Sequence, residues 1–274
     1  MSNKKDSLGD RMKENYENRA KTYLTRRTPV VMRYDGKAFH TYTKGFERPY
    51  DEIFHKAMNE TMKYLCENIQ GCKFGYTQSD EITLILTDYD KLTTDAWFDY
   101  AVQKMCSVGA SMATVAFNKF ITQAINDVVG LWLVDEIKGN RELTDEEQKR
   151  KEKLLAIAKK MPVFDCRCFN IPEDEVVNCV LWRQQDATRN AIQMLGQCHL
   201  SDKQLDGKSS NEIQDMLMVE KGINFNDMPV AFKRGVCCIK SERGWVIDEN
   251  PPIFTQDREY ISRAFRTNAD VKNS

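Results

Sequence analysis

The apolar positions of this chain follow two patterns, a helical one in long segments and a strand-like one in short segments. Over residues 51–69 they recur every three or four positions, which predicts an amphipathic helix with Asp51 as its N-cap. Residues 6–24 and 93–126 also carry helical patterns. Short apolar runs that are typical of buried strands occupy residues 29–35, 73–76, 81–87 and 163–169.

The C-terminal half continues these patterns and ends in a hairpin. Residues 135–160 are highly charged, and Thr144 with Glu147 forms a capping box for a helix over residues 145–159. The remaining elements that we predict are helices over 173–196 and 211–220 and strands over 235–240 and 244–247.

From residue 29 to residue 169, apart from the charged segment, the predicted elements come in the order strand–helix–strand–strand–helix–strand, which is the ferredoxin-like pattern. We therefore predict an α/β (α+β) fold: a polymerase-palm-like, ferredoxin-type βαββαβ core with additional helices and a C-terminal hairpin. The core with its metal site would span residues 25–134, a charged helical arm 135–160, and the remaining strands and helices 161–274. No repeat or linker divides the chain, so we expect residues 1–274 to form a single unit.

Composition and charge exclude several classes of protein. The net charge is −1, so any nucleic-acid partner has to be held by local patches. No run approaches the roughly 20 apolar residues of a membrane span, and the polar N-terminus is unlike a secretory signal. The nine cysteines lack the C-x-x-C spacing of a structural zinc site. These features favour a cytoplasmic protein with reduced thiols and no membrane partner.

Two short acidic motifs lie where predicted strands give way to turns. Asp35 and Gly36 end the first strand, and Ser79, Asp80 and Glu81 occupy the turn between the second and third. In a ferredoxin-like layout the two aspartates converge, and paired carboxylates with glycine nearby suit a two-metal nucleotidyl-transfer site. Each motif taken alone is also explained as an ordinary turn.

Under the two-metal hypothesis each of these residues has a separate role. The ligands of two Mg²⁺ ions would be Asp35, the main chain of Gly36, and Asp80, because Mg²⁺ prefers oxygen ligands. Glu81 would support the metal site, which makes Asp35, Asp80 and Glu81 the candidate catalytic residues. Backbone N–H groups, lysines and a hydroxyl would hold a nucleotide triphosphate; the residues are Asp35, Gly36, Lys37, Ala38, Phe39, His40, Lys44, Ser79 and Asp80.

A third segment, residues 181–190, combines a tryptophan, two arginines and several amides on one predicted helix. Arginine suits phosphate and tryptophan suits base stacking, so the segment is a candidate RNA or nucleotide surface. A helix with a buried Trp182 and a solvated polar face explains the same pattern.

Four stretches of this chain resemble the histidine-tRNA guanylyltransferase family of 3′–5′ RNA polymerases. In order they are RYDGKAFHTYTKGFERPYD, GYTQSDEITLIL, WRQQDATRN and INFNDMPVAFKRGV, and the similarity runs over about residues 5–245. The resemblance implies a palm that activates the 5′-phosphate of a tRNA with ATP or GTP. The 3′-hydroxyl of an incoming nucleotide then attacks the activated end. It also implies a homotetramer, and contact between tRNA and Arg183, Arg189 and Asn190.

The sequence departs from that family in one place. Eukaryotic members that add a single guanosine to histidine tRNA carry a His-Ile-Asn-Asn-type run where this chain has Thr188-Arg189-Asn190-Ala191. The chain is more similar to the guanylyltransferase-like branch that repairs 5′-truncated tRNA by templated addition. Single-guanosine addition, a palm-type nucleotide cyclase and a non-catalytic RNA-binding module are the alternatives.

Overall fold

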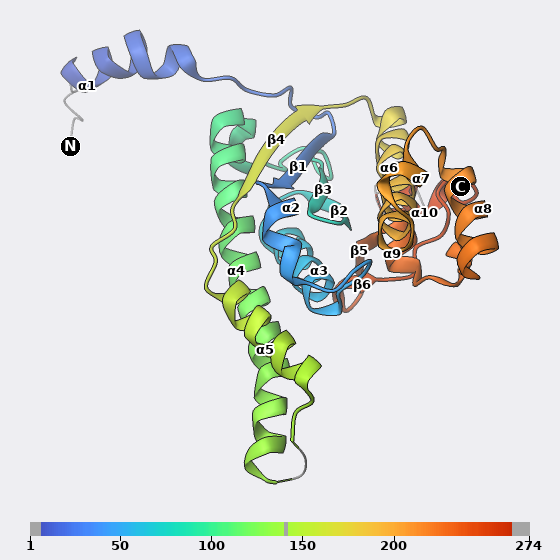
Figure 1. The fold of residues 1–274 in the computed structure, drawn as a ribbon. Coiled ribbons are helices and arrows are strands. Elements are labelled where there is room, and N and C mark those ends of the chain that lie inside the picture. Colours follow the sequence, from blue (N-terminus) through green and yellow to red (C-terminus); the bar gives the residue numbers. More distant parts are fainter. Residues whose placement is uncertain (1–6, 140–141, 265–274) are drawn as a thin grey trace.

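The computed structural model describes residues 7–139 and 142–264, so residue 6 of the predicted first helix and residues 140–141 of the arm lie outside it. Its helices and strands follow one another along the chain as Figure 1 shows. They are α1 (Ser7–Met12), β1 (Val30–Gly36), α2 (Phe39–Tyr42), α3 (Glu52–Asn68), β2 (Cys72–Gln78), β3 (Glu81–Leu86), α4 (Val102–Ile137), α5 (Asp145–Ala158), β4 (Phe164–Asn170), α6 (Glu173–His199), α7 (Asp202–Leu205), α8 (Ser210–Lys221), α9 (Val230–Arg234), β5 (Val236–Ser241), β6 (Gly244–Asp248) and α10 (Glu259–Ser262).

The sheet confirms the predicted ferredoxin-type core. Its strand order is β4-β1-β3-β2-β5-β6, and every neighbouring pair is antiparallel. The first four positions are the ferredoxin-like arrangement, in which β3 is inserted between the two strands that α3 connects. The predicted C-terminal hairpin is β5 and β6, and it extends the sheet beyond β2.

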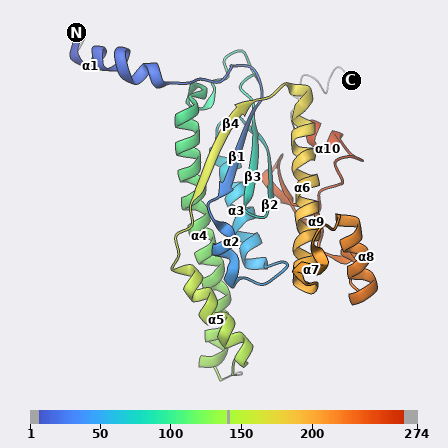
Figure 2. The same ribbon diagram turned by 45° about the horizontal axis from the view of Figure 1, so that its top comes forward.

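Strand alternation divides the hydrophobic core between the two faces of the sheet. Even-numbered residues of β1, such as Met32, pack with α3 and α4 in the larger cluster. Val31 on the opposite face packs with Val180 of α6 and with Phe254 in a second cluster. A third cluster joins the end of α6 to α8 and α9. Figure 2 shows α4 and α6 flanking the sheet on opposite sides.

Two helices differ from their predicted extents. The predicted helix over 6–24 ends at Ala20 and changes type along its length: α1 is followed by a π-helix over Lys13–Glu17 and a 3-10 helix over Asn18–Ala20, and none of these residues is buried. The predicted helix over 93–126 begins at Val102 and continues to Ile137. Residues 98–100 have positive φ angles, and Asp99 forms an ion pair with Arg26, so this segment is held in a turn.

The charged segment over 135–160 forms a helical hairpin with the end of α4. Thr144 and Glu147 make the predicted capping box, and α5 packs back on α4 through Leu154 and Ile157. The hairpin projects away from the sheet (Figure 1). Residues 201–210, where the sequence predicts no helix or strand, contain the short helix α7.

Gly75 sets how closely α3 approaches the sheet. A Cβ atom at this position would lie 2.6 Å from the sulfur of Cys66 and 3.1 Å from Met62, both on α3. We expect Gly75→Ala to lower the free energy of unfolding by about 1–3 kcal/mol through overpacking. The control is Gly130→Ala in α4, where an added Cβ meets nothing within 4 Å. We expect it to raise stability by about 0.5–1 kcal/mol. Urea unfolding of both variants measures these changes, and equal effects would contradict the packing argument.

Candidate active site

The pairing of β1 with β3 brings the two acidic motifs together. Asp35 lies opposite Glu81 in the antiparallel register, and the N–H of Gly36 donates to the main-chain oxygen of Asp80 at 3.2 Å. Ser79 turns the β2–β3 hairpin with a φ of 49°, and its hydroxyl lies 3.1 Å from Oδ1 of Asp80. The predicted convergence of Asp35 and Asp80 is therefore present at one edge of the sheet.

Negative charge accumulates at this edge. Burial, together with the nearby carboxylates of Asp35 and Glu81, raises the pKa of Asp80 from 3.8 to about 6. Within residues 7–139 and 142–264, neither Asp35 nor Asp80 has a lysine or arginine as an ion-pair partner. Two converging carboxylates without a protein counter-ion are an arrangement that a bound cation neutralises.

The donor set fits a magnesium ion that relies on its substrate for further ligands. Asp35 and Asp80 supply carboxylate oxygens, and Gly36 between them supplies a main-chain carbonyl. The described residues contain no cluster of three or more His, Cys, Asp or Glu side chains placed to hold a metal. This agrees with Mg²⁺, which is usually bound by one or two carboxylates together with phosphate and water.

The loop after β1 presents main chain at the site while its aromatic side chain anchors it. Phe39 is buried against Phe117 and Phe164, with ring centroids 5.4 and 5.0 Å away. Ala38 adopts the left-handed conformation with a φ of 57°, and Lys37 and His40 are exposed. Phe39 therefore positions the loop through the core, and its ring is not available to a ligand.

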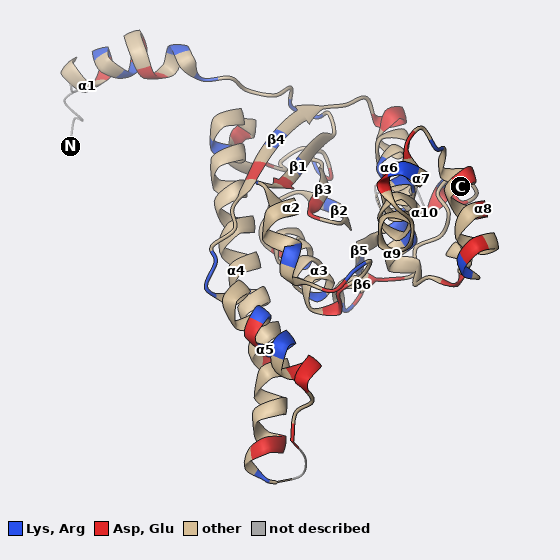
Figure 3. Ribbon diagram, in the orientation of Figure 1, with Lys and Arg blue, Asp and Glu red and all other residues tan. Residues whose placement is uncertain are grey.

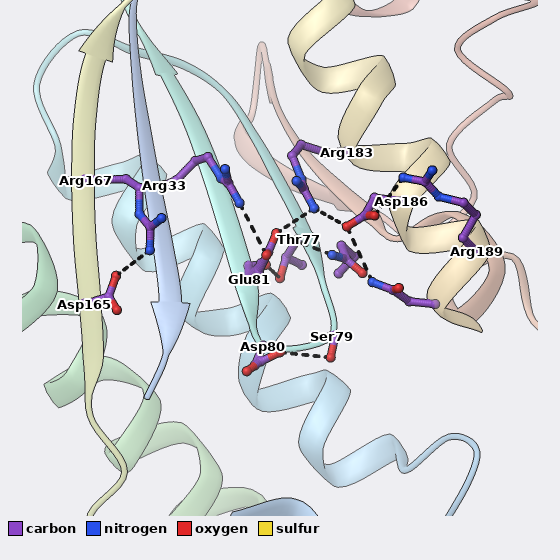
Figure 4. A network of polar contacts seen from close by, with 12 residues as sticks. Arg33, Thr77, Ser79, Asp80, Glu81, Asp165, Arg167, Arg183, Asp186 and Arg189 are labelled. Carbon is purple, nitrogen blue, oxygen red and sulfur yellow. Dashed lines mark hydrogen bonds and ion pairs between the residues drawn. The ribbon is translucent and has the colours of Figure 1, made fainter. Parts of the chain in front are cut away.

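Glu81 differs from the two aspartates because arginines neutralise it. Arg183 of α6 lies 3.0 Å from its carboxylate, and Arg33 of β1 lies 3.4 Å away (Figure 4). Arg183 is 3% exposed and also pairs with Asp186, which in turn pairs with Arg189. This network fixes α6 over the sheet, and it gives Arg183 a structural role at the site that sequence alone did not indicate.

A pocket opens beside the acidic edge. One wall is the segment before α3, another is α6, and the β2–β3 turn forms the rim nearest Asp80. Apolar groups such as Phe46, Met194 and Phe232 line it together with Arg48, Gln78, Ser79 and Asn190. A mostly apolar pocket with a few polar groups suits a flat organic ring.

The predicted site residues fall into two groups around this pocket. Ser79 and Asn190 line it, whereas Lys44 is exposed and lies outside the lining, as do Lys37 and His40. The sequence prediction missed Arg48 and Phe232. Both lie inside motifs that the family resemblance covers, but only the packing of α9 and of the segment before α3 on α6 reveals that they share a pocket.

Comparison with known proteins decides the family. The sequence pattern of Thg1, tRNAHis guanylyltransferase, matches residues 9–172, more than half of the chain. The chain belongs to the tRNAHis guanylyltransferase family. It is thus an enzyme of a nucleotidyltransferase family, as the sequence predicted. The tRNA(His) guanylyltransferase of Saccharomyces cerevisiae is 31% identical over 220 residues, which cover 75% of this chain and 80% of the yeast protein.

Two solved structures extend the similarity of this guanylyltransferase-family chain to its fold. A bacterial tRNA(His) guanylyltransferase (Thg1)-like protein in complex with ATP superposes with a TM-score of 0.80 at 41% identity, covering 95% of this chain and 100% of that one. A bacterial Thg1-like protein in complex with GTP gives a TM-score of 0.72 at 38% identity, covering 94% and 99%. The predicted fold class is confirmed by both.

The arginine network yields a stability prediction for this guanylyltransferase-family fold. Arg183→Met leaves Glu81 and Asp186 without their buried partner, so we expect it to lower the free energy of unfolding by about 3–5 kcal/mol. Arg189→Met is the control, because the Arg189 side chain is 60% exposed and pairs with the same Asp186. For that exposed pair we expect a loss of about 0–1 kcal/mol. Denaturant unfolding compares the two, and similar losses would show that Arg183 does not hold the site together.

The pocket wall contains a titratable group that makes stability depend on pH. Burial lowers the pKa of His55 from 6.5 to about 4, and its ring stacks on Tyr50 at a centroid distance of 4.0 Å. Below pH 6.5 the unfolded chain binds a proton that folded His55 rejects, so stability falls as the pH drops from 6.5 towards 4. His55→Phe keeps a ring and should lose this contribution. We expect the difference in unfolding free energy between variant and wild type to shift in favour of the variant from pH 7 to pH 5. A constant difference would contradict the assignment.

Proposed function

We propose that this chain is a Mg²⁺-dependent 3′–5′ nucleotidyltransferase that adds nucleotides to the 5′ end of tRNA. The observation that carries the proposal is the convergence of Asp35 and Asp80 next to a mostly apolar pocket, whose lining includes Ser79 beside Asp80. In this role the 5′-phosphate of tRNA attacks the α-phosphate of ATP or GTP and releases pyrophosphate. The 3′-hydroxyl of the incoming nucleotide then attacks the activated 5′-phosphate and releases AMP or GMP. The solved complexes of bacterial relatives with ATP and with GTP support a nucleotide as the occupant.

Each part of the proposed site has a physical task. Asp35, Asp80 and the Gly36 carbonyl would hold two Mg²⁺ ions, which supply neutralisation of phosphate charge at the reacting centre. The apolar pocket would take the base, and Ser79 on its rim would donate to the base or a phosphate. The N–H groups of Gly36 and Lys37 already donate to the main-chain oxygens of Asp80 and Val163, so within Gly36–His40 it is the N–H groups after Lys37 that would face the triphosphate. The exposed side chains of Lys37 and Lys44 would neutralise phosphate charge.

Templated repair of 5′-truncated tRNA is the form of the reaction that we favour. Within Thr188–Ala191, Thr188 bonds to the main-chain oxygens of Gln184 and Lys233, and Ala191 is buried. Only two side chains of that run, Arg189 and Asn190, are left to face RNA. So small a surface suits an enzyme whose incoming nucleotide is chosen by base pairing with the opposite strand.

A homotetramer and a cytoplasmic location complete the proposal. Helix α4 carries few charges along its length (Figure 3) and exposes Val115, Leu131 and Ile137, at 69%, 69% and 83%. Exposed apolar side chains of this kind are ones that subunit contacts would bury. All nine cysteines are free thiols, which fits a reducing compartment. No helix within the described residues is long and apolar enough to cross a membrane.

The decisive assay uses a 5′-monophosphorylated tRNA that lacks its first nucleotide, with Mg²⁺ and all four nucleoside triphosphates. We expect extension that matches the opposite template base. Asp35→Asn should lower the rate about 1,000-fold or more, because charge stabilisation by the metal is worth several kcal/mol. Asp90→Asn is the matched control: Asp90 lies beyond the other end of β3 and pairs with Lys73.

Other products would redirect the assignment. A single untemplated guanosine added only to histidine tRNA would support the histidine-tRNA activity in place of repair. A cyclic product from nucleoside triphosphate alone would place the chain among palm-type cyclases. Binding of tRNA that survives Asp35→Asn and Asp80→Asn, without turnover by wild type, would support a non-catalytic RNA-binding module.

A further inference from the structure

An uncovered strip of side chains runs along the sheet between β4 and α6. In the register of β1 with β4, Arg33 lies opposite Arg167 and Val31 lies opposite Phe169, so their side chains share the face that α6 covers only in part. Asp35 lies opposite Asp165 one step further along. Because side chains on one face recur about every 7 Å along a strand, the strip leads in regular steps towards the acidic edge.

Two aromatic rings stand exposed at the far end of the strip. Trp182 of α6 is 45% exposed and Phe169 of β4 is 36% exposed. The sequence offered a buried Trp182 as one alternative, but its side chain is partly exposed and two guanidinium groups lie over its ring. Arg183 lies 4.3 Å from the ring centroid and Arg33 lies 5.4 Å from it. Such contacts hold the indole in one orientation with part of its surface open to a ligand.

Arginines occupy the middle of the strip. The side chain of Arg167 is 56% exposed and touches Asp165 through a single terminal nitrogen, at 3.3 Å. Arg33 likewise uses one terminal nitrogen on Glu81. Figure 4 shows both arginines on the neighbouring strands β1 and β4. A guanidinium carries five N–H donors, so each retains donors for a phosphate oxygen.

We propose that this strip, Phe169, Trp182, Arg167 and Arg33, binds the acceptor end of the tRNA whose 5′ end reacts at Asp35 and Asp80. Bases left unpaired opposite the truncated 5′ end stack on Trp182 and Phe169, and backbone phosphates contact the arginines. Proteins that bind single-stranded nucleic acid combine aromatic and basic side chains in this way. The positive charge of the strip is local, because the whole chain carries a net charge of −1. The inference rests on the proposed function, since it assigns the path of that reaction's substrate.

Binding of the 5′-truncated, monophosphorylated tRNA tests the strip. We expect Trp182→Ala to weaken binding about tenfold or more, the loss typical of one stacked base, and Trp182→Phe to weaken it less. Val219→Ala, at an 84% exposed position on α8, is the control for removing an exposed apolar side chain. Binding of ATP should be equal in all of these variants, which also checks that they are folded.

The arginine is tested by the salt dependence of the same binding. Arg167→Gln should lower the slope of log affinity against log salt by about 1, because one phosphate contact is lost. Arg243→Gln, in the exposed β5–β6 turn, removes the same charge away from the strip and should leave the slope unchanged. RNA should also quench part of the tryptophan fluorescence in wild type, and that part should be absent in Trp182→Phe.

The outcomes separate this inference from the proposed function. If wild type extends tRNA but Trp182→Ala and Arg167→Gln bind it as wild type does, the strip is wrong and the function stands. A changed salt slope with no effect of Trp182→Ala overturns the stacking contact. If wild type neither binds nor extends tRNA, both proposals fail together.

Discussion

The antiparallel pairing of β1 with β3 is the constraint on which the rest of this structure depends. It places Asp35 opposite Glu81 and ties the main chain of Gly36 to that of Asp80. Because the side-chain period of a strand is two, a slip of one residue would turn Asp35 away from its partners and bury it. The even positions of β1 prevent that slip, since Met32 and Tyr34 are buried against the helices on the opposite face. Core packing and site geometry are therefore set by one register.

The three carboxylates beside that register are not equally neutralised, and this difference distinguishes Glu81 from the two aspartates. Glu81 is held by Arg33 and Arg183, so its negative charge is already compensated within the fold. Asp35 and Asp80 lie next to it without such partners in the described part of the chain, and burial raises the pKa of Asp80 to about 6. A carboxylate pair left in this condition is costly unless a cation joins it. The fold thus neutralises one carboxylate with arginine and leaves the two that we propose as metal ligands without such a partner.

The sequence predicted the core well because its elements depend on local patterns. The βαββαβ order, the hairpin of β5 and β6, and the caps at Asp51 and Thr144 all follow from periodicity and capping chemistry within short windows. The start of α4 was placed too early, since the turn over residues 98–100 is held by a contact between Asp99 and the distant Arg26. Similarly, α1 is short because nothing packs on it within the described residues.

Only the part of the site that lies within single short motifs was predictable from the sequence. The convergence of Asp35 and Asp80 could be predicted because each lies where a strand gives way to a turn, and the strand order then places these turns side by side. The pocket was not found, because Arg48, Asn190 and Phe232 come from three segments that meet only after α6 and α9 pack. We expected Arg183 to face RNA, but its side chain is only 3% exposed because it pairs with Glu81, which lies 102 positions earlier in the chain. Such pairings carry no signal in the sequence near either residue.

The central claim is that Asp35 and Asp80 hold the metal that binds nucleotide at this pocket. A crystal structure with ATP and Mn²⁺, with anomalous scattering used to locate the metal, tests it most directly. The account predicts an anomalous peak in contact with the carboxylates of Asp35 and Asp80 and with the Gly36 carbonyl. ATP bound in the pocket without a peak at those three groups, or a peak held by other residues, would contradict it.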